Sequence, residues 1–161
     1  MAGDPYRIAP AVSPEDLSAI AGLFRAYADS LGIDLGYQDF ATELAGLPGK
    51  YAPPAGVLLL ARDGADMPIG CVALRPIEPA GCCEMKRLYV SPAGRGLGLG
   101  RVLAERVITE AERIGYREIR LDTLPFMQAA IGLYQALGFV AIPPYYDTPV
   151  EGTRFLGKRL G

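Results

Sequence analysis

Residues 94–101, GRGLGLGR, constrain the fold of this chain more than any other stretch. Three of the glycines alternate with leucines, and the segment lies between a strand-like run at 82–90 and a helix-like run at 101–115. Glycine lets the backbone adopt left-handed conformations and approach a ligand closely. Unpaired N–H groups at a helix start, together with the helix dipole, favour a bound anion. The segment therefore predicts a tight strand-to-helix turn, with an anion-binding loop as its functional interpretation.

Two well-known phosphate-loop patterns do not fit this segment. The dinucleotide pattern GxGxxG requires glycine at position 99 or 101, where the chain has leucine and arginine. The pattern GxxxxGK[ST] fails because no Gly-Lys-Ser or Gly-Lys-Thr occurs. What remains is Arg95-x-x-Gly98-x-Gly100 between a strand and a helix.

Helix-like and strand-like segments alternate along the rest of the chain. Ser13 followed by Pro14 predicts the start of a helix that ends near Gly32, with apolar residues at three- and four-residue steps along it. The order of segments predicts an α/β or α+β fold, a sheet covered by helices, in a single domain over 1–161. Further helices are expected at 39–47, 99–115 and 126–137, and strands at 6–12, 57–64, 68–77, 82–90, 117–124, 139–142 and 153–160.

The composition argues against several partners. A formal net charge of -2 offers no electrostatic attraction to nucleic acid or to an anionic membrane surface, so neither is expected as a partner. No apolar run approaches the roughly 18 to 20 residues of a membrane span. Residues 1–10 lack the basic start and apolar stretch of a secretory signal. We therefore expect a cytoplasmic protein.

The chemistry available to the chain is also limited by what it lacks. There is no histidine, which excludes nucleophile–histidine pairs and histidine-ligated metals. Cys71, Cys82 and Cys83 have no CxxC spacing, so we expect small buried strand residues and no metal site. Acid–base chemistry then falls to carboxylates, tyrosines, a lysine, a cysteine or water.

Two stretches together resemble a known family. The strand MKRLYV, the run Arg95-Gly96-Leu97-Gly98-Leu99-Gly100 and the following amphipathic helix resemble the acetyl-CoA motif R/Q-x-x-G-x-G/A of the GNAT family of N-acetyltransferases. AIGLYQALGF at 130–139 is similar to that family's penultimate helix. The likeness covers nearly the whole chain, from about residue 6 to the C-terminus. It implies a mixed central sheet that splays open near its middle, with acetyl-CoA as cosubstrate in the gap and no metal.

The resemblance also implies which residues hold acetyl-CoA. Backbone groups of the strand before the glycine segment pair with the pantetheine arm in this family. The pyrophosphate rests on backbone N–H groups of the loop, where oriented amides bind phosphate oxygens without a basic protein, and an arginine adds charge. The cofactor-binding residues expected here are Leu88, Val90, Arg95, Gly96, Leu97, Gly98, Leu99, Gly100 and Arg101.

Tyr134 is a candidate catalytic residue. It occupies the position at which relatives often carry the tyrosine that protonates the coenzyme A thiolate. An ordinary tyrosine pKa near 10 is close to that of an alkyl thiol, so the proton transfer is energetically reasonable. The alternative is an aromatic on the buried face of its helix.

Glu84 is the second catalytic candidate, as a general base. It lies eleven positions before Arg95, where some relatives carry a catalytic glutamate. A carboxylate in an otherwise apolar strand is costly unless it is paired or functional. The alternatives are a structural ion pair with Lys86 or Arg87, and a chain of waters as the proton acceptor.

Lys86 and Arg87 are unusual in the middle of a central strand. They have two interpretations: contact with an acidic group of the substrate, or pairing with Glu84 and Asp122. The walls of the acceptor site are expected to be the loop PPYYDTPVEG at 143–152 and the first helix with its following loop. The sequence does not identify the acceptor.

The resemblance implies an enzyme that transfers acetyl from acetyl-CoA to a primary amine of a small-molecule or peptide acceptor, by direct attack in a ternary complex. Two alternatives stay open: a non-catalytic acyl-CoA-binding sensor or interaction module, and an acyltransferase that uses another acyl-CoA. A homodimer formed through the C-terminal strand is expected, with a monomer as the alternative.

Overall fold

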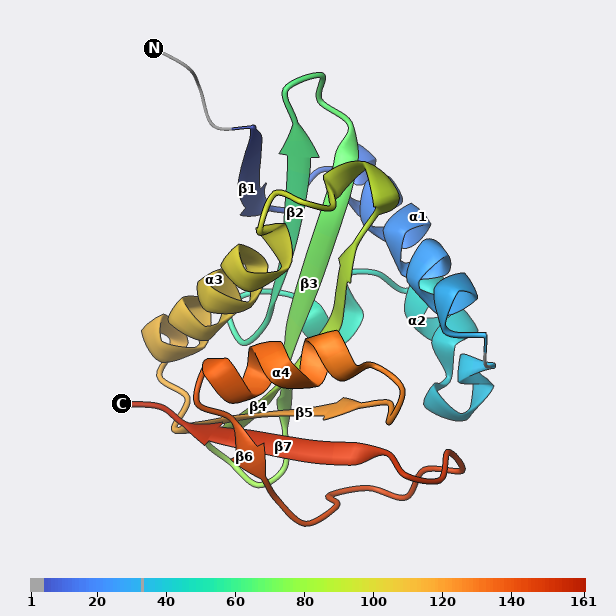
Figure 1. Ribbon diagram of the computed structural model, residues 1–161. Helices are drawn as coiled ribbons and strands as arrows, with labels where there is room; N and C mark the ends of the chain where they lie inside the picture. The colour runs from blue at the N-terminus through green and yellow to red at the C-terminus, as the bar shows by residue number, and fades with distance from the viewer. Residues whose placement is uncertain (1–4, 33) are drawn as a thin grey trace.

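The computed structural model describes residues 5–32 and 34–161 and contains one mixed sheet with helices on both faces (Figure 1). The sheet has seven strands in the order β1-β2-β3-β4-β5-β7-β6. Neighbouring strands are antiparallel except β4 and β5, which are parallel. The strands are β1 (Tyr6–Pro10), β2 (Val57–Asp63), β3 (Pro68–Ile77), β4 (Cys82–Val90), β5 (Glu118–Thr123), β6 (Val140–Ala141) and β7 (Arg154–Arg159).

The helices divide between the two faces because β2 and β3 are apolar on both sides. Leu58 and Leu60 of β2 pack with α1, whereas Leu59 packs with α3 on the other face. Three cysteines are buried in β3 and β4, as expected from their apolar strands. The α-helices are α1 (Pro14–Leu31), α2 (Phe40–Ala45), α3 (Leu99–Ile114) and α4 (Gln128–Ala136), and the 3-10 helices are η1 (Leu35–Gln38), η2 (Gly49–Tyr51) and η3 (Pro92–Gly94).

The ends of α1 follow from its sequence. The Ser13 hydroxyl accepts a hydrogen bond from the Asp16 amide at 3.1 Å, which caps the first turn. Gly32 ends the helix in the left-handed conformation, with φ 68°. Ile20 and Phe24, one turn apart, are fully buried. The expected helix from Pro14 to Gly32 is confirmed.

Two expectations, one about the second helix and one about the C-terminal strand, need correction. The helix expected at 39–47 is shorter, Phe40–Ala45, and a 3-10 turn precedes it. The C-terminal strand β7 is not a sheet edge, because it lies between β5 and β6. The edges are β1 and the two-residue β6, so the middle of the strand proposed for dimerisation is covered within the chain.

The sheet splays between β4 and β5. The two strands pair only through Cys82–Glu118, Cys83–Ile119 and Glu84–Arg120. Beyond Glu84 they diverge, and β5 and β7 run across the direction of β2 to β4 (Figure 1). The part of β4 from residue 85 onward therefore turns one backbone edge toward a gap in the sheet.

A bulge in β4 changes the direction of its side chains. Cys71 of β3 pairs with Tyr89, but Ala73 pairs with Lys86, so β4 has one extra residue at this point. Arg87 takes up the extra residue in the left-handed region, with φ 61°. In a regular strand Lys86 and Arg87 would point to opposite faces. Here both reach the same acceptor atom, Oε1 of Gln38.

Candidate active site

The glycine segment forms an anion cradle at the start of α3. Gly96 and Gly98 have φ of 84° and 69°, the left-handed region that glycine reaches without strain. The Val102 amide donates to the Gly98 carbonyl oxygen at 3.3 Å, which is the first hydrogen bond of the helix. The amides of residues 99–101 precede that bond and, as at any helix start, have no partner within the helix. They are available to a ligand that carries negative charge.

The glycines of this segment have two different roles. A Cβ atom at Gly94 would lie 2.9 Å from the Ile69 carbonyl oxygen, so glycine is needed there for packing against β3. A Cβ atom at Gly96 or Gly98 would meet nothing within 4 Å, and one at Gly100 only Cγ2 of Val90 at 3.8 Å. The space beside the last three glycines is open, which fits a bulky ligand lying against the backbone.

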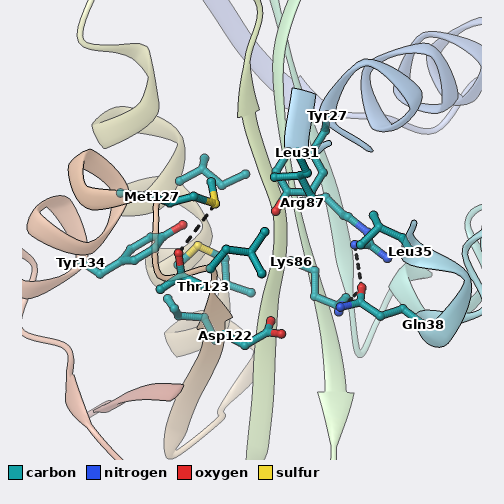
Figure 2. A pocket seen from close by; sticks show the side chains of 15 residues that line it. Tyr27, Leu31, Leu35, Gln38, Lys86, Arg87, Asp122, Thr123, Met127 and Tyr134 are labelled. Carbon is teal, nitrogen blue, oxygen red and sulfur yellow. Dashed lines mark hydrogen bonds between the residues drawn. The ribbon is translucent and has the colours of Figure 1, made fainter. Parts of the chain in front are cut away.

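A pocket of about 70 Å³ occupies the gap in the sheet (Figure 2). Four parts of the chain contribute its walls, and one of the two elements expected beside the acceptor, α1 with its following turn, is among them. The other, the loop at 143–152, does not line the pocket; its Tyr145 and Tyr146 hydroxyls donate hydrogen bonds to Glu84 and Asp122. The lining residues are Tyr27, Leu31, Leu35 and Gln38; Met85, Lys86, Arg87 and Leu88; Leu121, Asp122, Thr123 and Leu124; and Met127, Ala130 and Tyr134.

Tyr134 lies in this pocket, on the wall formed by α4. The residue is 7% exposed, and its ring packs edge-to-face on Phe139 with centroids 5.8 Å apart. Figure 2 shows the phenol oxygen directed toward the gap. Burial raises the pKa of Tyr134 above its ordinary value, with the negative charge of Asp122 adding to the effect. The phenol therefore keeps its proton at neutral pH.

Glu84 is held in a buried network outside the pocket lining. Its Oε1 lies 2.8 Å from Nη2 of Arg75 and 3.8 Å from Nζ of Lys86. The Tyr145 hydroxyl donates to Oε2 at 2.6 Å. Burial alone would raise the pKa of Glu84, but Lys86 and Arg75 outweigh it and hold this pKa below the ordinary value. These contacts favour the ion-pair interpretation over the base.

Arg87 and Lys86 form the wall opposite Tyr134. Arg87 makes a bidentate pair with Glu43, with both N–O distances at 3.0 Å, and Nη1 donates to Gln38 at 2.8 Å. Its guanidinium also lies 5.1 Å from the centre of the Phe40 ring. Nζ of Lys86 donates to Gln38 at 3.3 Å. Of the ion pairs considered from the sequence, the one between Arg87 and Glu84 does not form, because Arg87 pairs with Glu43 on α2.

A model of the acetyltransferase (GNAT) family matches residues 22–139, which include the cradle and Tyr134. The chain belongs to the GNAT family. It is 42% identical over 143 residues to an uncharacterised N-acetyltransferase of Schizosaccharomyces pombe, covering 89% of this chain and 88% of that protein. The chain is therefore an N-acetyltransferase, and acetyl-CoA is the acetyl donor that GNAT enzymes use.

Solved structures show the same fold. A GNAT acetyltransferase from Staphylococcus aureus aligns with a TM-score of 0.81 at 19% identity, covering 97% of this chain and 99% of that one. An acetyltransferase from Salmonella typhimurium, solved with its cofactor acetyl-CoA, aligns with a TM-score of 0.68 at 22% identity over 98% of this chain and 95% of that one. The mixed, splayed sheet expected from the resemblance is confirmed. Among the helices of the described chain, none has the length and apolar character of a membrane span.

Two polar residues around the GNAT pocket, Gln38 and Glu43, were not expected from the sequence, and a third, Asp122, was expected only as a possible partner of Lys86 or Arg87. Gln38 bonds both cations of β4, and Glu43 pairs with Arg87. Asp122 lines the pocket from β5 and accepts a hydrogen bond from the Tyr146 hydroxyl. Asp122 had a weak signal, because it follows buried Leu121 at the end of an alternating strand. Gln38 and Glu43 had none, since the short helices that carry them have no strong periodicity.

Replacing Glu84 by glutamine tests its role directly. We expect a loss of about 1 to 3 kcal/mol in the free energy of unfolding, because Arg75 and Lys86 lose their buried anion. The folded pKa of Glu84 is depressed below 4.5, so its stabilisation is present above that pH and is lost as pH falls through the folded pKa. The stability difference from wild type should therefore shrink in acid, as urea titrations across pH would measure.

Glu110→Gln is the matched control, because Glu110 pairs with Arg113 on the exposed side of α3. This change should cost less than about 1 kcal/mol. If Glu84→Gln keeps its stability but loses turnover and the acidic limb of its pH–rate profile, Glu84 is the base after all.

Proposed function

We propose that the chain transfers acetyl from acetyl-CoA to a primary amine of a small-molecule or peptide acceptor, by direct attack in a ternary complex. The observation that carries the proposal is the role of β4: its residues 85–88 line the gap, and the chain then runs through η3 into the anion cradle at the start of α3. Tyr134 lies in that gap. A ligand with phosphates at the cradle would have its reactive end beside the phenol.

The residues present fit acetyl-CoA. The amides of residues 96–101, with the charge of Arg95, would hold the pyrophosphate, because the Arg95 amide itself donates to the Pro92 carbonyl oxygen. The free edge of β4 at Leu88 and Val90 would pair with the pantetheine amides, because β5 no longer occupies that edge. Leu99 is 1% exposed and packs in the core, so it would contribute only its backbone.

Acetyl-CoA supplies an activated thioester; a carbon–nitrogen bond to the amine forms and the carbon–sulfur bond breaks. Tyr134 holds a proton at Oη for the leaving sulfur. Burial disfavours a thiolate in the same gap as it disfavours a tyrosinate, so the raised pKa of Tyr134 does not prevent the transfer. We assign removal of the amine proton to water, because Glu84 is bonded to Arg75 and Tyr145.

Thiol release from acetyl-CoA across amino acids, polyamines, aminoglycosides and peptides tests the function. Release that depends on one class of amine supports the proposal. Coenzyme A binding by calorimetry without release on any amine would instead support a sensor or interaction module. Faster release from propionyl- or succinyl-CoA would identify a different acyl donor.

A further inference from the structure

We propose that the acceptor is an amine that also carries a carboxylate, an amino acid in type, and that Lys86 binds this carboxylate while Asp122 faces the amine. The inference rests on the proposed acetyl transfer and names the acceptor class of the same pocket. Two observations carry it: the buried ammonium of Lys86 has fewer hydrogen-bond acceptors than donors, and the carboxylate of Asp122 lies on the facing wall.

Three cations and two carboxylates lie together on one side of the sheet, where the β4 bulge adds Arg87 to the register partners Arg75 and Glu84. Arg75 pairs with Glu84, and Arg87 pairs with Glu43. Lys86 is the remaining cation of this cluster, and the third carboxylate nearby, Asp122, lies across the pocket and forms no ion pair with it within 4.0 Å. The two arginines occupy their carboxylates at 2.8 to 3.0 Å, whereas Lys86 lies 3.8 Å from Glu84.

Lys86 has donors to spare at the pocket wall. Its side chain is 7% exposed, and the hydrogen bond from Nζ to Gln38 is long, at 3.3 Å. An ammonium has three donors, and a buried one is costly unless they are paired. Burial and neighbouring Arg87 lower the pKa of Lys86, although Glu84 opposes them. A substrate carboxylate in the pocket would complete the pairing.

Asp122 provides the opposite charge on the β5 side of the same pocket. Figure 2 shows its carboxylate directed from β5 toward β4. One oxygen accepts from the Tyr146 hydroxyl, which fixes the carboxylate in position. Among the described residues Asp122 and Lys86 form no ion pair within 4.0 Å, although Asp122 acts on the lysine electrostatically. Two separated opposite charges across a small pocket complement the ammonium and carboxylate of an amino acid.

Matched amines with and without a carboxylate test this acceptor class. Thiol release would be compared for alanine against ethylamine, phenylalanine against phenethylamine, and aspartate against β-alanine, with kcat/KM corrected to the neutral amine. We expect the member with the additional α-carboxylate to be used about 10 to 100 times better in each pair, the range of a hydrogen bond between charged groups. Lys86→Gln should reduce this preference to less than about threefold with coenzyme A affinity unchanged.

Lys158→Gln is the control, because it removes a strand lysine that does not line the pocket. It should keep the full preference. Should Lys86→Gln fail to fold, inhibition of the wild-type enzyme by N-acetylalanine against N-ethylacetamide gives the same comparison. Ethylamine used as well as alanine, or a preference that survives Lys86→Gln, would overturn the inference. If no amine of these pairs is acetylated but a polyamine or aminoglycoside is, the proposed amino-acid acceptor is wrong and the proposed acetyl transfer is still supported.

Discussion

Gly100→Trp is expected to raise the Kd for coenzyme A by roughly 100-fold or more while the protein stays folded. Gly100 is the second residue of α3, and its Cβ position is open apart from Val90 at 3.8 Å. A large side chain there would fill the space that we propose for the phosphates and would separate them from the helix amides. Tryptophan is also a better helix residue than glycine, so the helix itself is not weakened. Isothermal calorimetry with coenzyme A measures the effect.

Two controls separate occlusion from damage to the fold. Gly22→Trp makes the same change at an exposed position of α1 with open space around it, and should leave coenzyme A affinity unchanged. Gly100→Ala adds only a methyl group at normal contact distance and should bind within a few-fold of wild type. Gly98 is a poorer test site, because its φ of 69° would strain any side chain whatever the ligand does. Undiminished affinity in folded Gly100→Trp would reject the phosphate cradle.

Tyr134→Phe is expected to lower kcat by about 10- to 1,000-fold, as loss of a general acid does. The phenylalanine ring can keep the edge-to-face contact with Phe139, so the melting temperature and the Kd for coenzyme A should change little. Steady-state kinetics, with calorimetry for binding, measures both quantities. A drop in kcat without a change in affinity is the mark of an interaction made only during the reaction.

Tyr116→Phe is the matched control for this substitution. Tyr116 donates a hydrogen bond to the Ala55 carbonyl oxygen and does not line the pocket. Its variant should turn over at the wild-type rate. If Tyr134→Phe does the same, Tyr134 is a core aromatic and the leaving thiolate takes its proton from solvent.

The sequence predicted the elements that depend on local patterns. The cap at Ser13, the stop at Gly32 and the amphipathic α3 follow from short-range rules, and the structure has all three. The glycine loop was predictable for the same reason, because left-handed φ values at Gly96 and Gly98 are properties of single residues. Long-range contacts were not predictable in this way.

The partners of the charged β4 residues depend on such long-range contacts. Nothing near Glu84 in sequence indicates that Arg75, across the β3–β4 pairing, would neutralise it. The bulge at Arg87 is also a tertiary feature, since a strand pattern has strict alternation and arginine is not a typical left-handed residue. Without the bulge, Lys86 and Arg87 would be assigned to different faces. The partners of the β4 cations were therefore out of reach of the sequence, whereas the first helix and its following turn were expected beside the acceptor and do line the pocket.

The three residue pairs between β4 and β5 have a consequence for the behaviour of the whole molecule. These pairs are the short connection between two halves of the sheet. A ligand bound in the adjacent gap would contact both halves and hold them together. Resistance to heat should then depend on the cellular supply of the donor, because a ligand at 100 times its Kd adds about 2.7 kcal/mol to the free energy of unfolding. The free energy of unfolding would therefore be highest when the concentration of acetyl-CoA is high.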